Sequence, residues 1–198
     1  MPSTSSPPIQ TSQRILDCAE RLVQTQGFNG FSYADIAAEL HVTKASLHYH
    51  FATKAELGTE LIGRYHDNFQ RALDGIDHEE RDARRKLRRY ADLYAGVLRK
   101  DRMCLCGMLA SDFATLPPPM KDAVKRFFDA NERWVARVLD EGRKAHALRL
   151  AGAAPELART LVAALEGAML VARSYGEVSR FEAAAERLVA QLVGRQRT

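Results

Sequence analysis

The strongest constraint on this chain is a hydrophobic period near 3.6 residues that recurs along almost its whole length. No window alternates apolar and polar residues between hairpin turns, which is the pattern of a half-exposed strand. The periodicity therefore predicts an all-α protein. With 198 residues, of which 46% are hydrophobic, the chain can bury a core without disulfides or a structural metal.

The cellular setting is predicted from the cysteines and the apolar segments. Cys18, Cys104 and Cys106 form an odd number, which argues against a secreted disulfide framework. No apolar stretch approaches the roughly 20 residues of a membrane span, and residues 1–10 lack the apolar core of a signal peptide. We therefore expect a cytoplasmic protein with no membrane contact, in which residues 1–10 form a flexible arm.

The net charge of +4 suits a polyanionic partner, but its distribution is uneven. Residues 1–60 carry four Lys or Arg against six Asp or Glu, whereas residues 81–89 hold six basic side chains. Ala83, Leu87, Tyr90 and Tyr94 interrupt and follow this basic run at helical spacing. The run is therefore predicted to be the solvated face of an amphipathic helix rather than a nucleic-acid site.

Four helices are expected in the first third of the chain, over residues 11–26, 33–40, 44–50 and 54–73. The two short helices begin after good N-cap residues, which are Ser32, paired with Asp35 in a capping box, and Thr43. Further capping boxes are predicted at residues 53–56 and 179–182. Beyond residue 74 we expect four or five more helices.

Two short helices around a tight turn, each too small to be stable alone, are typical of a helix-turn-helix packed on a supporting helix. At about 100° per residue, Leu47 and Phe51 face inward. The outward residues are then Ala45, Ser46, His48 and Tyr49. Small side chains allow close approach to a DNA groove, and the hydroxyl and imidazole groups can bond bases or phosphates.

Three segments resemble the TetR/AcrR family of bacterial transcriptional repressors, namely FSYADIA at residues 31–37, VTKASLHYHF at 42–51 and TKAEL at 53–57. The resemblance is strong over residues 11–60. It implies that the helix beginning after Thr43 reads the major groove, with His48 at a position where the family more often has tyrosine. It also implies DNA contacts by Ser32, Thr43, Lys44, Ala45, Ser46, His48, Tyr49, His50 and Lys54.

The same resemblance implies a division of the chain into a DNA-binding domain at residues 11–55 and a ligand-binding and dimerisation bundle at 56–198, with about nine helices in all. The last two helices, expected over residues 155–175 and 179–193, are rich in Ala, Leu and Val, and Gly167 allows close helix approach. Such a pair suits a four-helix bundle across a two-fold axis, although a buried pair within one chain has a similar pattern. The resemblance thus implies a homodimer that binds a pseudo-palindromic operator in double-stranded DNA and is released by a small-molecule inducer.

An inducer pocket should be concave and mainly apolar, with few polar groups. The candidates in the bundle are aromatic, sulfur-containing or basic: Tyr90, Tyr94, Cys104, Met108, Phe113, Phe127, Trp134, Met169 and Arg173. Aromatic and Met residues at helical spacing are also what an ordinary core contains.

Three interpretations are open for the pair Cys104 and Cys106. Both can be buried structural thiols, since free cysteine behaves as a small hydrophobe. One can be a redox or electrophile sensor, because basic residues precede the pair at 99, 100 and 102. A metal site is the third, but it needs further ligands that the sequence does not supply nearby.

The sequence contains no Gly-rich phosphate loop, nucleophile elbow, paired metal-binding histidines or carboxylate dyad. We therefore expect no enzyme activity, no cofactor and no metal. The two alternatives are a thiol enzyme built on Cys104 or Cys106, and an interaction module that does not bind DNA. The second leaves the outward face of residues 45–49 unexplained.

Overall fold

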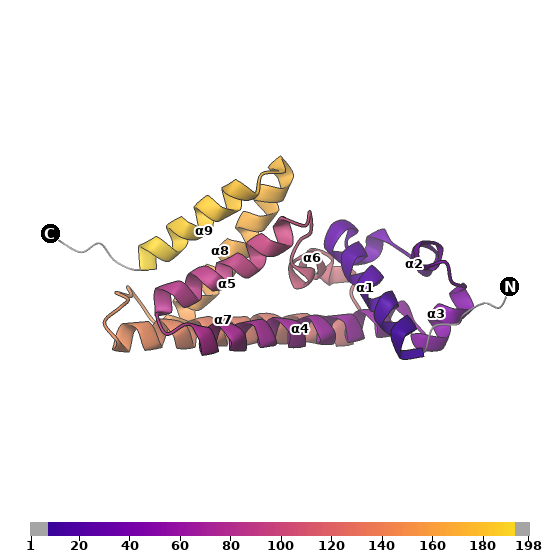
Figure 1. Cartoon of the computed structure of the whole chain (residues 1–198), viewed down its shortest axis with the longest axis horizontal. Helices are drawn as coiled ribbons and strands as arrows, with labels where there is room; N and C mark the ends of the chain where they lie inside the picture. Colours follow the sequence, from indigo (N-terminus) through magenta and orange to yellow (C-terminus); the bar gives the residue numbers. More distant parts are fainter. Residues whose placement is uncertain (1–7, 193–198) are drawn as a thin grey trace. The chain divides into compact units, whose positions relative to one another are not determined.

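The computed structural model describes residues 8–192, and within this range it contains helices and no strand (Figure 1). This confirms the predicted all-α fold. The described residues form nine α-helices and two 3-10 helices, in the order α1 (Pro8–Gln26), η1 (Phe28–Gly30), α2 (Tyr33–Leu40), α3 (Lys44–His50), α4 (Lys54–Glu79), α5 (Ala83–Leu98), α6 (Leu105–Ser111), η2 (Phe113–Thr115), α7 (Pro118–Lys144), α8 (Ala154–Tyr175) and α9 (Val178–Leu192).

The chain forms two compact units. Unit 1 comprises the residues up to 65 together with 105–124, and unit 2 comprises 66–104 together with 125 onward. The long helices α4 and α7 each contribute residues to both units. The compact units describe packing, whereas the boundary predicted after residue 55 separates two functions. That boundary therefore stays a prediction.

Most predicted helix bounds agree with the structure to within a few residues. The predicted bounds of α2 and α3 match, but α1 begins at Pro8 rather than at residue 11, so residues 8–10 are helical and not part of an arm. Residues 1–7 of the predicted arm lie outside the described residues. Helix α4 continues to Glu79, six residues beyond its predicted end, because Ile76 continues its buried apolar face.

Unit 1 is held together by the apolar stripes of its helices. Ile15 and Ala19 of α1, Ile36 of α2, Leu47 of α3 and Leu61 of α4 are almost fully buried. These are the positions that a 3.6-residue period places on one face of each helix. Packing against α1 and α4 therefore stabilises α2 and α3, which are too short to be stable alone.

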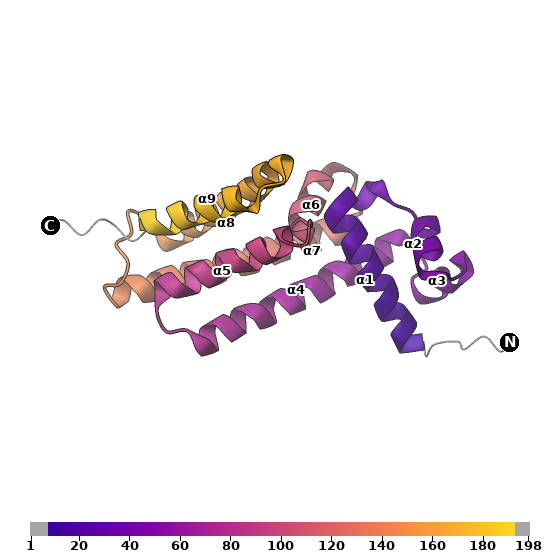
Figure 2. The same ribbon diagram turned by 45° about the horizontal axis from the view of Figure 1, so that its top comes forward.

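Unit 2 is a helical bundle in which α9 packs along α8, and α5 packs against both (Figure 2). The buried face of α5 consists of Leu87, Tyr90, Tyr94 and their neighbours. The arginines of the basic run at residues 81–89 are exposed or half-buried, as predicted for the solvated face of this helix, and Arg88 pairs with Glu186 at 3.0 Å. Its neighbours Arg84 and Arg89 also have partners.

One member of the basic run, Lys86, is buried and does not lie on the solvated face as predicted. Its ammonium pairs with Asp77 Oδ1 at 2.8 Å and with Glu141 Oε2 at 3.3 Å. Burial alone raises the pKa of Asp77, but hydrogen bonds from Lys86, Arg137 and Trp134 outweigh it and hold this pKa below its usual value. The ion pairs compensate for the desolvation of Lys86.

Gly142 near the end of α7 allows a close approach of two other segments. A Cβ atom at this position would lie 2.5 Å from Leu148 Cδ1 and 2.7 Å from Ala83 Cβ. The turn after α7 and the start of α5 therefore depend on the absence of a side chain at residue 142.

Candidate nucleic-acid interface and bundle core

The start of α2 is fixed by a capping box, as predicted. Ser32 Oγ accepts a hydrogen bond from Ala34 N at 3.2 Å, and Asp35 Oδ2 accepts from Ser32 N at 2.7 Å. Ser32 Oγ also donates to Asp35 at 2.8 Å, and this bond is the largest cause of the lowered pKa of Asp35. The cap sets the direction in which α2 leaves the preceding loop.

Helix α3 is held by its own cap and by two buried residues. Thr43 Oγ1 accepts a hydrogen bond from Ser46 N at 3.1 Å, and His41 adopts the left-handed conformation (φ 55°) that ends α2. Leu47 and Phe51 are buried, as predicted. Lys44, Ala45, His48 and Tyr49 are exposed with Thr43, whereas Ser46 and His50 are half-buried.

Tyr33 joins the two short helices, a role that the sequence reasoning missed. Its hydroxyl donates to the carbonyl of Phe51 at 2.9 Å, and its ring centroid lies 4.9 Å from that of His48. Burial raises the pKa of Tyr33 to about 12, so the phenol remains a hydrogen-bond donor at neutral pH. Tyr33 thus ties the first residue of α2 to the residue that follows α3.

His48 has one ring nitrogen engaged by the protein. Its Nδ1 lies 3.0 Å from the carbonyl oxygen of Ala52, and a carbonyl can only accept, so Nδ1 carries the hydrogen. In the neutral imidazole Nε2 is then an acceptor. A neutral His48 can therefore accept but not donate a hydrogen bond at Nε2, and a DNA contact by His48 stays a prediction.

Lys54 also has partners within unit 1. Its Nζ donates to the carbonyl of Phe28 at 2.5 Å and to the carbonyl of Phe31, and it lies over both phenylalanine rings. Burial lowers the pKa of Lys54, an effect that Asp112 and Asp35 oppose. Lys54 lines a concavity of about 410 Å³ with Ser32, Lys44 and His48 among others. A phosphate contact by Lys54 stays a prediction, and its ammonium holds the loop between α1 and α2.

Asp112 fixes the other side of this loop. Its Oδ2 accepts hydrogen bonds from Phe28 N at 2.7 Å and from Asn29 N at 3.4 Å. Gly27, with φ of 82°, has no Cβ to fill the space beside this carboxylate. Asp112 thereby holds η1 and the carbonyls that receive Lys54.

Among residues 8–65, Lys44 is the one Lys or Arg without an acceptor from the protein. Arg14 donates to the Leu40 carbonyl, Arg21 pairs with Glu39, and Arg64 pairs with Asp17 and Glu20 at 2.7 Å each. The free cation of this segment therefore lies at the first residue of α3.

In unit 2, four of the predicted ligand residues form one aromatic cluster. Tyr90 stacks on Trp134 with centroids 5.5 Å apart, and its hydroxyl lies 2.9 Å from that of Tyr94. Tyr90 also donates to Asn131 Oδ1 at 3.2 Å. Phe69, which sequence reasoning missed, packs edge-on against Tyr90, Tyr94 and Phe127.

The other predicted ligand residues are divided between the two units. Cys104 and Met169 are buried in unit 2, whereas Met108 and Phe113 belong to unit 1. Arg173 lines a separate surface groove of about 240 Å³ with Leu98, Arg102 and five other residues. Four of the nine residues thus form the aromatic cluster of unit 2, and ligand binding by the nine stays a prediction.

The two neighbouring cysteines are both buried, with 1% exposure for Cys104 and none for Cys106. Cys104 precedes α6 rather than sharing a helix with Cys106. No group of three or more His, Cys, Asp or Glu side chains in the described part of the chain could hold a metal ion. Burial is the arrangement expected for structural thiols.

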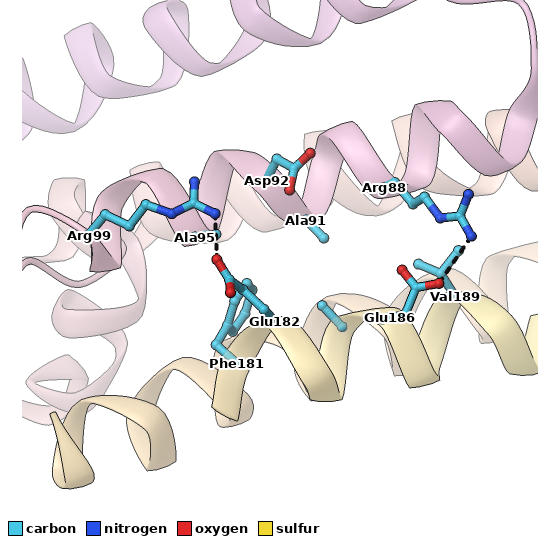
Figure 3. A pocket seen from close by; sticks show the side chains of 10 residues that line it. Arg88, Ala91, Asp92, Ala95, Arg99, Phe181, Glu182, Glu186 and Val189 are labelled. Atoms are coloured by element: carbon cyan, nitrogen blue, oxygen red, sulfur yellow. Dashed lines mark hydrogen bonds and ion pairs between the residues drawn. The ribbon is translucent and has the colours of Figure 1, made fainter. Parts of the chain in front are cut away.

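A surface groove of about 230 Å³ lies between α5 and α9, and none of the predicted ligand residues lines it (Figure 3). Ion pairs span it at two places, Arg88 with Glu186 at 3.0 Å and Arg99 with Glu182 at 2.5 Å.

The capping box predicted at residues 179–182 is wrong, because α9 already begins at Val178 and Glu182 pairs with Arg99.

The capped pair α2 and α3, with an exposed polar face on α3 above a buried Leu47, defines the helix-turn-helix class of DNA-binding protein. Within residues 8–192, no helix has the length and apolar character needed to cross a bilayer.

Comparison with known proteins agrees with this class. The sequence profile described as "Bacterial regulatory proteins, tetR family" matches residues 15–61, and the profile "Tetracyclin repressor-like, C-terminal domain" matches residues 83–188. The chain therefore belongs to the TetR family of bacterial regulatory proteins, which confirms the family predicted from residues 31–57.

Individual relatives cover most of the chain. The HTH-type transcriptional repressor DhaR of Mycobacterium sp. (strain GP1) is 24% identical over 163 residues, 80% of each chain. The structure of a TetR family regulator from Agrobacterium tumefaciens is 29% identical, covers 95% of this chain and 100% of that one, and gives a TM-score of 0.92. A TetR regulator from Legionella pneumophila is 30% identical, with 96% and 100% coverage and a TM-score of 0.85.

Proposed function

We propose that this protein is a cytoplasmic repressor that binds a pseudo-palindromic operator as a homodimer and is released by a small-molecule inducer. The observation that carries the proposal is the exposed face of α3, where Lys44 has no acceptor in the protein and Tyr49 is 79% exposed. An exposed tyrosine and a free lysine on a short capped helix suit close approach to DNA. The relative DhaR is itself described as a transcriptional repressor, which supports repression rather than activation.

The first test measures DNA affinity as a function of salt. Lys44→Ala should weaken operator and random DNA alike and flatten the salt slope by about one, because one phosphate contact is lost. Lys121→Ala is a matched control in unit 1, since its Nζ already donates to the Ala114 carbonyl at 3.2 Å. If a Lys44→Ala, Tyr49→Ala double variant keeps full operator affinity, α3 is not the DNA-reading helix.

His48 should contribute to base preference rather than to phosphate binding. With Nδ1 engaged by Ala52, the neutral ring offers Nε2 as an acceptor, which matches the amino groups of cytosine or adenine in the major groove. His48→Ala should therefore relax the preference at one base pair in each half-site and leave the salt slope unchanged. Selection of bound DNA from a random pool checks this, and a changed salt slope with an unchanged base preference contradicts it.

The dimer contact is proposed on α8. This helix exposes Leu170 (49%) and Val171 (55%) beside Gly167, whose absent Cβ has no neighbour within 4 Å. Exposed apolar side chains next to a glycine suit a close two-fold helix contact. Val171→Glu should give monomers in light scattering and abolish specific DNA binding. Ala145→Glu, at an exposed position after α7, is the control, and an intact Val171→Glu dimer would exclude this contact.

The burial of Cys104 and Cys106 favours a reversible ligand over a reactive cysteine as the signal, because a sensing thiolate must be reachable. Alkylation by iodoacetamide should therefore be slow at both positions in the native protein and fast in urea. Rapid native labelling at either residue, accompanied by loss of operator binding, would establish sensing by cysteine instead.

A further inference from the structure

One acidic side chain lies inside unit 2 without a cation. Glu166 is on α8, between the buried Leu165 and the exposed Gly167. The residue as a whole is half-buried, and its Oε1 atom is buried with no hydrogen-bond partner among the described residues. A buried carboxyl oxygen without a donor is destabilising, because it has lost its hydrogen bonds to water. Such an atom in a folded protein needs an explanation.

The surroundings of Glu166 are aromatic and apolar. The thiol of Cys104 donates a hydrogen bond to the carboxyl, and the charge of Glu166 is among the causes that raise the pKa of Tyr90 and of Tyr94 on α5. Both tyrosines belong to the aromatic cluster with Phe69 and Trp134. No basic side chain in the described part of the chain balances the carboxylate.

The site therefore lacks one positive charge and one hydrogen-bond donor, and it offers aromatic rings to the body of a ligand. We propose that Glu166 and the Tyr90–Tyr94 wall bind an apolar organic amine in its protonated form. The ammonium would donate to Glu166 Oε1, and the aromatic rings would attract the cation and cover the apolar body. This ligand class rests on the proposed function, in which the bundle receives an inducer.

A protonated amine fits better than a neutral donor, because an alcohol supplies a hydrogen bond but leaves the buried carboxylate charge unbalanced. An anion is repelled by Glu166. Met169, one turn further along α8, is fully buried and unbranched, so its side chain can rearrange around a ligand beside Glu166.

The test uses three probes with the same hydrocarbon chain, n-hexylamine, 1-hexanol and hexanoate, measured by thermal shift and calorimetry on the full chain without DNA. Hexylamine should raise the melting temperature, hexanol should do so less, and hexanoate should not. Glu166→Gln keeps the size of the side chain and removes its charge. It should lower the affinity for hexylamine by about tenfold or more and leave hexanol binding unchanged, since only the ionic part is removed.

Glu182→Gln is the matched control, because it removes a carboxylate of the α5–α9 groove and should not change amine binding. The inference is overturned if hexylamine does not bind, if it binds Glu166→Gln equally well, or if Glu182→Gln is the variant that abolishes binding. Operator affinity of the unmodified chain is measured separately. Failure to bind operator refutes the proposed function, whereas operator binding without amine binding refutes only the ligand class.

Discussion

Replacing the buried carboxyl of Glu166 should change how the stability of the protein depends on pH. Burial raises the pKa of Glu166 from 4.5 to about 7, although the hydrogen bond from Cys104 lowers it. Between these two values the folded protein holds a proton that the unfolded chain has lost. Stability therefore falls as the pH rises from 4.5 to 7, and it stays reduced above 7.

The difference between 4.5 and about 7 corresponds to a loss of roughly 3 kcal/mol once Glu166 is ionised. Glu166→Gln cannot ionise, so it should be more stable than the unmodified protein at pH 8 and close to it at pH 5. For a chain of this size the gain at pH 8 corresponds to about 6–12 °C in melting temperature. Burial also raises the pKa of Tyr90 and Tyr94, so these neighbours remain neutral over this range.

Thermal melts of both proteins at pH 5 and pH 8 measure this effect. Glu60→Gln, at an exposed position of α4, is the control and should show no such pH-dependent gain. Equal melting temperatures of Glu166→Gln and the unmodified protein at pH 8 would refute the reasoning, because the carboxyl would then ionise without cost.

Three further changes test the packing. Gly142→Ala should destabilise the protein by about 1–3 kcal/mol, because the added Cβ would collide with Leu148 and Ala83. Gly63→Ala, whose Cβ would lie in open space within α4, should stabilise it by about 0.5–1 kcal/mol. Urea unfolding measures both changes. Lys86→Met should cost about 1–3 kcal/mol in the same assay, because Asp77 and Glu141 lose one of the two cations that they share and keep only Arg137. Asp112→Ala should cost about 1–2 kcal/mol and speed hydrogen exchange at the amides of residues 28 and 29, whereas unchanged exchange would contradict the cap.

The helix-turn-helix could be predicted closely because its signals are local. The spacing of Ile36 and Leu47 determined the buried faces, and the caps at Ser32 and Thr43 determined where the helices begin. Both are properties of a few adjacent residues. The failed capping box near Glu182 shows the limit of such signals, since the carboxylate binds Arg99, the residue that follows α5, instead.

The residues that sequence reasoning missed depend on contacts between distant segments. The carbonyls that Lys54 binds lie 26 and 23 residues earlier in the chain, so local spacing could not predict these contacts. Asp112 caps Phe28 across 84 residues. Glu166 did leave a signal, as the one acid beyond the first turn of the Ala- and Leu-rich helix α8, yet periodicity alone could not show that its Oε1 atom is buried.

The single free lysine in residues 8–65 bears on how the protein searches the chromosome. Each phosphate neutralised by a lysine or arginine releases counterions, and this release drives attachment to DNA of any sequence. Lys44 is the one Lys or Arg of this segment that has no acceptor in the protein. Counterion release should therefore contribute little to the affinity of the protein for random DNA. Few copies would then be sequestered along the genome, so a small number of molecules per cell could keep an operator occupied, and that occupancy would change little when the internal salt concentration rises.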